Sequence, residues 1–157
     1  MPQFKNTADL LSFLRKSVDK ALTTDVFPAV RDMEIEAINE TVYSHPASNY
    51  YRRREESGGL GDPSNIIMKG GGAKNGILAV INITPPNPYL DGVSAAGGMA
   101  TVSKSLPSVV EYGYGYDYWK SPRTRPFTKN TIKKLSSSGV CAEALKQGLL
   151  KQGITAR

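Results

Sequence analysis

Apolar residues recur at intervals of three and four in the first part of the chain, and this spacing constrains the fold more than any other feature. The set is Leu10, Leu11, Leu14, Val18, Ala21, Leu22, Val26, Val30, Met33, Ala37 and Ile38. Such spacing places the side chains on one face of a helix. We therefore predict a long amphipathic helical region over residues 7–44, with Thr7 as its N-cap and Asp9 in its first turn.

Pro28 interrupts this pattern. Because proline has no N–H to bond one turn back, the helix should kink or divide near Phe27. The apolar spacing is lost before Tyr43, where we expect the helical region to end. The solvated face of the helix is predicted to carry the acidic side chains Asp32, Glu34, Glu36 and Glu40.

Residues 50–84 predict two short antiparallel strands. One candidate covers residues 66–69, and the other covers residues 77–84, where the side chains alternate with the period of two of a half-buried strand. The glycine-rich stretch 70–76 is predicted to be a hairpin tip. Residues 85–105, rich in Gly, Ala, Ser and Thr, are predicted to be a flexible loop that a partner orders.

The last third of the chain predicts an irregular aromatic segment and then helices. Residues 106–127 contain four tyrosines and the tryptophan of the chain. Thr128 is the expected cap of C-terminal helices over residues 128–152, with a break at residues 136–139. This order predicts an α+β fold in a single domain over residues 1–157, with the long N-terminal helix and the C-terminal helices packed on a small antiparallel sheet.

Composition limits the chemistry of the chain. Cys141 is the one cysteine and His45 the one histidine, so a disulfide framework and a multi-cysteine metal site are excluded. No apolar run reaches the length of a membrane span, and residues 1–20 are charged throughout where a signal peptide would be apolar. We expect a cytoplasmic protein with no membrane partner.

Catalytic residues are not evident. His45 has no orienting carboxylate in the sequence, Cys141 lies in an apolar helical stretch, and the glycines at 70–76 match no phosphate-binding motif. We therefore predict no enzymatic activity, no cofactor and no metal. A small enzyme that uses His45 or Cys141 is kept as a remote alternative.

The net charge of +6 is unevenly distributed along the chain. Residues 1–49 have a net charge of −2, residues 50–118 are neutral, and residues 119–157 carry +8. An acidic first helix and a basic last segment suit a head-to-tail contact between neighbouring subunits. The same cations, together with the run 52–54, would also suit a nucleic-acid-binding module.

Two sequence blocks resemble a known family. The first is YRRREESGGLGDPSNI at residues 51–66, and the second runs from LPSVVEYGYG to TRPF within residues 106–127. In this order, after a long amphipathic helix, they are similar to the small neck or tail-completion (head–tail joining) proteins of tailed bacteriophages and of related prophage and tailocin-like particles. The resemblance implies an α+β subunit that forms a ring between head connector and tail tube, without enzymatic activity.

The resemblance also implies partners and a location. The expected assembly is a six- or twelve-fold homo-oligomeric ring that contacts neighbouring neck or connector proteins and the tail tube or tail terminator. DNA would pass through its lumen without sequence-specific binding. The protein would assemble in the cytoplasm of the bacterial host and reside in the neck or tail of the virion. A tail terminator is the nearest alternative, and a basic nucleic-acid-binding module is the alternative from a different class.

The two blocks supply the candidate interface and structural residues. We expect Pro126 to preset the backbone of the last helical region, Phe127 to anchor it in the core, and Glu111 to pair with Arg123 or Arg125, within one subunit or across the ring. The full candidate set is Arg52, Arg53, Leu60, Glu111, Tyr112, Gly113, Arg123, Arg125, Pro126 and Phe127.

Overall fold

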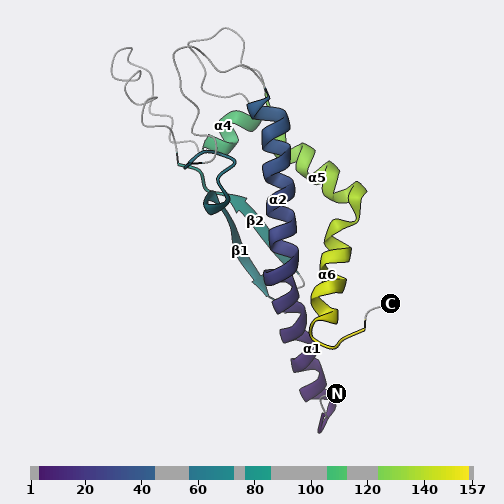
Figure 1. Ribbon diagram of the computed structural model, residues 1–157. Helices are drawn as coiled ribbons and strands as arrows, with labels where there is room; N and C mark the ends of the chain where they lie inside the picture. The colour runs from purple at the N-terminus through teal and green to yellow at the C-terminus, as the bar shows by residue number, and fades with distance from the viewer. Residues whose placement is uncertain (1–3, 45–56, 73–76, 86–105, 113–123, 156–157) are drawn as a thin grey trace, which may run out of the picture. The chain divides into compact units, whose positions relative to one another are not determined.

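Residues 7–43 form the predicted helical region. The computed structural model describes residues 4–44, 57–72, 77–85, 106–112 and 124–155 (Figure 1). Two α-helices alternate with two π-helical segments, so that the chain is helical from Thr7 to Tyr43. In order these are α1 (Thr7–Ala21), η1 (Leu22–Val26), α2 (Phe27–Ile38) and η2 (Asn39–Tyr43).

The N-cap of α1 is Asn6, so the prediction of Thr7 was wrong by one residue. Asn6 has extended backbone angles, and its side-chain oxygen accepts a hydrogen bond of 2.9 Å from the backbone N–H of Asp9. Thr7 is already helical. Both residue types cap helices well, so their order in the sequence does not decide between them.

Pro28 follows a change in helical hydrogen bonding. The π-helical segment η1 ends directly before α2, and the N–H of Phe27 bonds to the carbonyl of Leu22, five residues back. The irregularity predicted near Phe27 therefore takes the form of a π-helical segment, a feature that accommodates a proline without ending the helix.

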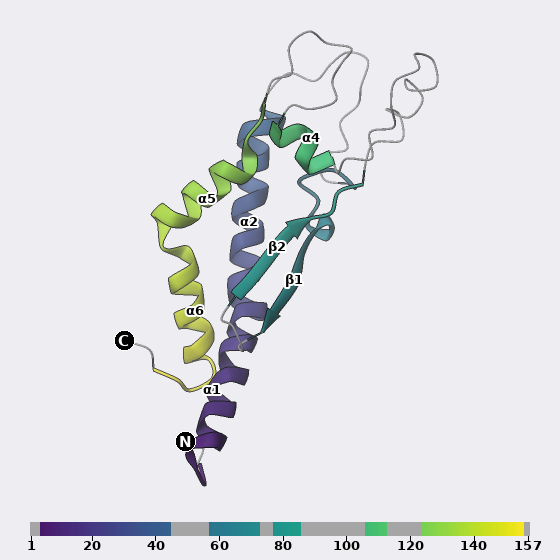
Figure 2. The ribbon, with the colours of Figure 1, turned by 180° about the vertical axis from the view of Figure 1, so that it is seen from behind.

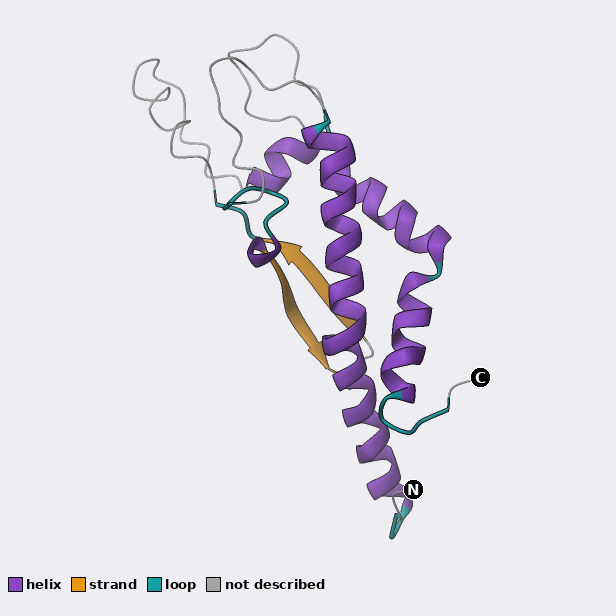
Figure 3. Ribbon diagram, viewed as in Figure 1, coloured by secondary structure: helices purple, strands orange, loops and turns teal. Residues whose placement is uncertain are grey.

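The two predicted strands form a two-stranded antiparallel sheet (Figure 3). The strands are β1 (Ile66–Gly72) and β2 (Ile77–Asn82), and the short 3-10 helix η3 (Pro63–Asn65) leads into β1. Strand β1 continues into the glycines that we had assigned to the hairpin tip. Along β2, Leu78 and Val80 are half-buried whereas Ile77 is 63% exposed, so the alternation predicted for this strand separates an inner from an outer face.

The segment 106–127, predicted to be irregular, begins with a helix. Helix α4 (Leu106–Tyr112) is followed, after the undescribed residues, by α5 (Phe127–Ser138) and α6 (Val140–Leu150). Helices α5 and α6 are drawn as separate helices in Figure 2. Gly139, between them in sequence, has a φ of +65°, in the left-handed region that glycine adopts without strain. The predicted break at 136–139 and the α+β class are confirmed.

Contacts group the chain into two compact units. Unit 1 consists of residues 1–33, 68–81 and 133–157, and unit 2 consists of residues 34–67 and 82–132. The assignment of residues 1–157 to a single domain stays a prediction.

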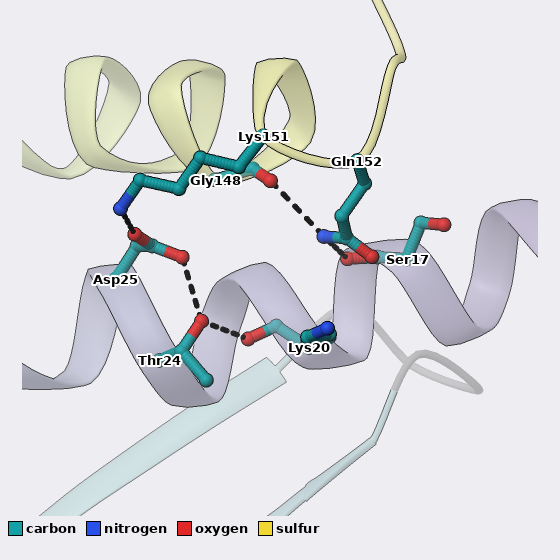
Figure 4. A network of polar contacts seen from close by, with 7 residues as sticks. All are labelled: Ser17, Lys20, Thr24, Asp25, Gly148, Lys151 and Gln152. Atoms are coloured by element: carbon teal, nitrogen blue, oxygen red, sulfur yellow. Dashed lines mark hydrogen bonds and ion pairs between the residues drawn. The ribbon is translucent and has the colours of Figure 1, made fainter.

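In unit 1, α6 packs closely against α1 and η1 (Figure 4). Ser17 and Ala21 of α1 are buried under α6, and an ideal Cβ on Gly148 would lie 2.7 Å from the Cβ of Ala21. The side-chain amide of Gln152 donates to the carbonyls of Ser17 (2.9 Å) and Gly148 (3.0 Å). Glycine at position 148 therefore allows the two helices to approach.

A salt bridge joins the same two helical segments. The ammonium of Lys151 donates to the carboxylate of Asp25, which also accepts a 2.6 Å hydrogen bond from the hydroxyl of Thr24 (Figure 4). Lys151 first, and then Thr24, lower the pKa of Asp25 below its ordinary value. One cation of the basic C-terminal segment is thus paired within its own chain.

The close approach at Gly148 predicts an unusual response to alanine. In an open helix, Gly to Ala stabilises by about 1 kcal/mol through helix propensity. In Gly148→Ala the added Cβ would also lie 3.1 Å from the Cα of Ala21, which cannot move unless α1 and α6 separate. We expect a net destabilisation of about 1–3 kcal/mol, measured as a lower thermal midpoint.

Ala142→Gly is the matched control. Residue 142 is exposed on the same helix, so this substitution should cost only the propensity term of about 1 kcal/mol. A Gly148→Ala variant that melts at a higher temperature than the wild type would contradict the packing described for α6.

Candidate functional site

The candidate residues that the structure describes all belong to unit 2. They come from both sequence blocks and comprise Leu60, Glu111, Tyr112, Arg125, Pro126 and Phe127. The other four candidates, Arg52, Arg53, Gly113 and Arg123, lie outside the described residues. Their roles, and the role of the whole set as an interface, stay predictions.

Glu111 of α4 caps the N-terminus of α5. Its carboxylate accepts hydrogen bonds from the backbone N–H groups of Thr128 (2.8 Å) and Lys129 (3.3 Å). A carboxylate at this position satisfies N–H groups that have no partner within the helix and interacts favourably with the helix dipole. The prediction that Thr128 is the cap was wrong, because Thr128 is the second residue of α5 and is capped by Glu111. Whether Glu111 also pairs with Arg123 or Arg125 stays a prediction.

The residues that precede α5 connect it to α4 and to the core. The N–H of Arg125 donates to the carbonyl of Val110 (3.0 Å), and the Pro126 carbonyl accepts the N–H of Asn130 (3.0 Å). Phe127, the first residue of α5, is only 1% exposed. Tyr112, at the last described position of α4, is 61% exposed and presents an aromatic ring to solvent.

The described part of the first sequence block, residues 57–66, contains a tight loop around buried Leu60. The carbonyl of Leu60 accepts 2.9 Å from the side-chain amide of Asn82, and the carbonyl of Gly59 accepts 2.8 Å from the side-chain amide of Asn65. The hydroxyl of Thr84, which is 1% exposed, also donates to Gly59 at 3.3 Å. Three polar side chains therefore fix the backbone of this loop.

Two further contacts hold the same loop. The N–H of Gly61 donates to the hydroxyl of Tyr43 (3.2 Å), and an ideal Cβ at Gly61 would lie only 3.2 Å from the ring of Tyr43. Asp62 accepts from the N–H groups of Gly58 and Ser64 and from the Ser64 hydroxyl. The hydroxyl of Ser64, followed by the backbone donors, lowers the pKa of Asp62 below its ordinary value.

Glu34 is buried, which contradicts its assignment to the solvated face of the first helix. Its side chain is in α2, the residue is 9% exposed, and one carboxylate oxygen accepts 3.2 Å from the side-chain amide of Asn82. Burial raises the pKa of Glu34; the Asn82 hydrogen bond opposes this effect, and the nearby charge of Glu111 adds to it. No ion pair of Glu34 occurs within the described part of the chain.

A signal for the burial of Glu34 was present in the sequence. Glu34 lies four residues after Val30 and four before Ile38, both of which belong to the apolar set. Residues four apart share a helix face, so position 34 lies on the face that the other acidic residues of this region avoid. The prediction of a solvated Glu34 rested on its acidic side chain and not on its position along the helix.

The described residues contain no cluster suited to metal binding. Over the described ranges, no group of three or more His, Cys, Asp or Glu side chains could hold a metal ion. Cys141 is half-buried in the first turn of α6, and His45 is outside the described residues. None of the helices that the structure describes is long and apolar enough to cross a membrane.

Comparison with known families identifies the chain as a bacteriophage protein. It belongs to the YomN family, whose model matches residues 6–151. No curated protein and no solved structure matches the chain. The phage part of the resemblance seen in the two sequence blocks is thereby confirmed.

The buried carboxylate of Glu34 predicts a specific pH dependence of stability. Because its pKa is raised in the folded state, the folded chain binds more protons than the unfolded chain between the unfolded and folded pKa values. The contribution of Glu34 to stability is therefore greatest at low pH and is lost as the pH rises through the folded pKa. Glu34→Gln keeps an acceptor for Asn82 but does not titrate.

We expect urea unfolding at a series of pH values to reveal this difference. From acidic to neutral pH, the stability of Glu34→Gln should rise relative to the wild type by on the order of 1 kcal/mol. Glu143→Gln, which removes an exposed carboxylate in unit 1, should follow the wild-type profile. A constant difference between Glu34→Gln and the wild type across this range would contradict the burial of a titrating Glu34.

Proposed function

We propose that this chain is a non-enzymatic structural protein of the virion that forms a ring in the phage neck and joins the tail to the head connector around the DNA channel. The observation that carries the proposal is its membership of a phage family combined with the two sequence blocks that resemble head–tail joining proteins. The neck location, the ring and its partners are our inference from these two facts.

The geometry of unit 2 supports a structural role for both blocks. The loop around Leu60 and the junction between α4 and α5 are built from hydrogen bonds to backbone groups, including those of Asn82, Thr84 and Glu111. Such contacts fix the shape of a surface and leave few polar groups available for chemistry. A subunit that must match the surfaces of its neighbours requires this kind of rigidity.

Exposed Tyr112 supports an interface next to this junction. Tyrosine is enriched in protein interfaces because its ring buries a large area while its hydroxyl remains able to form hydrogen bonds. At 61% exposure on α4, Tyr112 leaves most of its surface for a partner. In the proposed ring the partner is a neighbouring subunit or an adjacent neck protein.

Electron microscopy of particles made without this protein tests the proposal. We expect filled heads and finished tails that remain separate, and expression of the wild-type protein in trans should restore joined particles. Tails of abnormal length would instead indicate a tail terminator. Normal virions would contradict both roles.

A further inference from the structure

The positive charge of the chain is concentrated in unit 1. Its described residues include ten basic and five acidic side chains, a net charge of +5, whereas the described residues of unit 2 include two basic and five acidic ones, a net charge of −3. Charge counted along the sequence had placed the excess in residues 119–157. The fold instead joins the cations of α1 with those of residues 133–151 in one unit.

Most of these cations face solvent. Eight of the ten basic residues described in unit 1 are exposed, and they are Lys5, Arg15, Lys16, Lys20, Lys69, Lys133, Lys146 and Lys151. Two acidic residues of the same unit are already paired, Asp25 with Lys151 and Asp32 with Arg31 at 3.4 Å. Unit 1 therefore presents a net positive surface.

Helix α1 supplies three of these cations. Arg15, Lys16 and Lys20 are exposed, whereas Ser17 and Ala21 between and beyond them are buried against α6. With a rise of 1.5 Å per residue, Lys16 and Lys20 are about 6 Å apart along the helix axis. This separation is close to the rise of two nucleotides on one DNA strand, at about 3.4 Å each.

We propose that unit 1 binds the phosphate backbone of double-stranded DNA without reading its sequence, with Arg15, Lys16 and Lys20 of α1 in contact with phosphates. This inference draws its biological setting, DNA in a channel, from the proposed function. The affinity itself belongs to the free chain and does not require a ring.

The lysine-rich composition of unit 1 is suited to contact with a DNA backbone without sequence reading. Eight of the ten basic residues described in unit 1 are lysines, which act as flexible point charges. Such charges suit a uniform line of phosphates, where no single contact needs a fixed geometry.

The test measures binding of the full-length protein to a fluorescent DNA duplex of arbitrary sequence over a range of salt concentrations. A plot of log K against log salt has a negative slope, with about −0.9 from each phosphate contact. In the variant Arg15→Gln/Lys16→Gln/Lys20→Gln, the loss of three contacts should make this slope less negative by about 2.7. The charge-preserving variant Arg15→Lys/Lys16→Arg/Lys20→Arg should keep the wild-type slope. Circular dichroism establishes that each variant is folded.

A matched control separates a site on α1 from net charge alone. Lys129→Gln/Lys133→Gln/Lys146→Gln removes the same number of charges from α5 and α6, and we expect it to lose less affinity than the α1 variant. Equal losses in the two triple variants would overturn the assignment to α1. Absence of salt-dependent DNA binding, or stronger binding to poly-glutamate than to DNA at equal charge concentration, would overturn the proposal itself.

The outcome can be separated from that of the head–tail proposal. If the α1 variant loses DNA binding and particles still join, the neck role stands and DNA contact is dispensable for joining. If deletion of the protein leaves virions normal while the free chain binds DNA through α1, the inference about unit 1 stands without the neck role.

Discussion

Unit 2 depends on the side-chain amide of Asn82. Its two N–H groups donate to Glu34 and to the carbonyl of Leu60. Its oxygen accepts from the N–H of Thr84 and shares the single hydroxyl proton of Thr84 with the carbonyl of Gly59. These four bonds use the full hydrogen-bonding capacity of the amide. One residue at the end of β2 therefore joins α2 to the loop of the first sequence block. Because Glu34 is buried, a satisfied amide beside it matters more than it would at the surface.

The helix junctions follow the same physical requirement. Backbone groups at a helix terminus lack partners within the helix, and in this chain residues distant in sequence supply some of them. Glu111 caps α5 from a different helix. Gln152, beyond the end of α6, bonds to the carbonyl of Gly148 in the last turn of that helix and also to a carbonyl within α1. These contacts join elements through the backbone, so the shape of each unit does not depend on apolar packing alone.

The parts of this fold that the sequence predicts are those determined by local pattern. Apolar spacing located the helical region that ends at Tyr43, period-two alternation located β2, and glycine located the break at Gly139. Features determined by distant partners were missed. The cap on α5 comes from Glu111, which is 17 residues away in sequence. Helix α4 was not predicted because the tyrosines and glycines of residues 106–127 indicated an irregular segment.

Glu34 is the most informative miss at the candidate site. Its position on the apolar helix face can be deduced from the sequence. The hydrogen-bond donor that offsets the cost of its burial is Asn82, 48 residues away in sequence, and local pattern does not identify it. The net charge of each folded unit likewise depends on residues that are distant in sequence. Counting along the chain separated an acidic beginning from a basic end, whereas folding brings the basic residues of α1 and of the segment 133–151 into unit 1.

Cryo-electron microscopy of the neck of intact particles would show whether this phage protein forms the proposed ring that joins head and tail. At a resolution that allows side chains to be assigned, we expect a closed ring of this subunit between the head connector and the tail tube, with Tyr112 in contact with a neighbouring protein. The subunit located inside the head or at the distal tip of the tail, or absent from purified particles, would contradict the proposal.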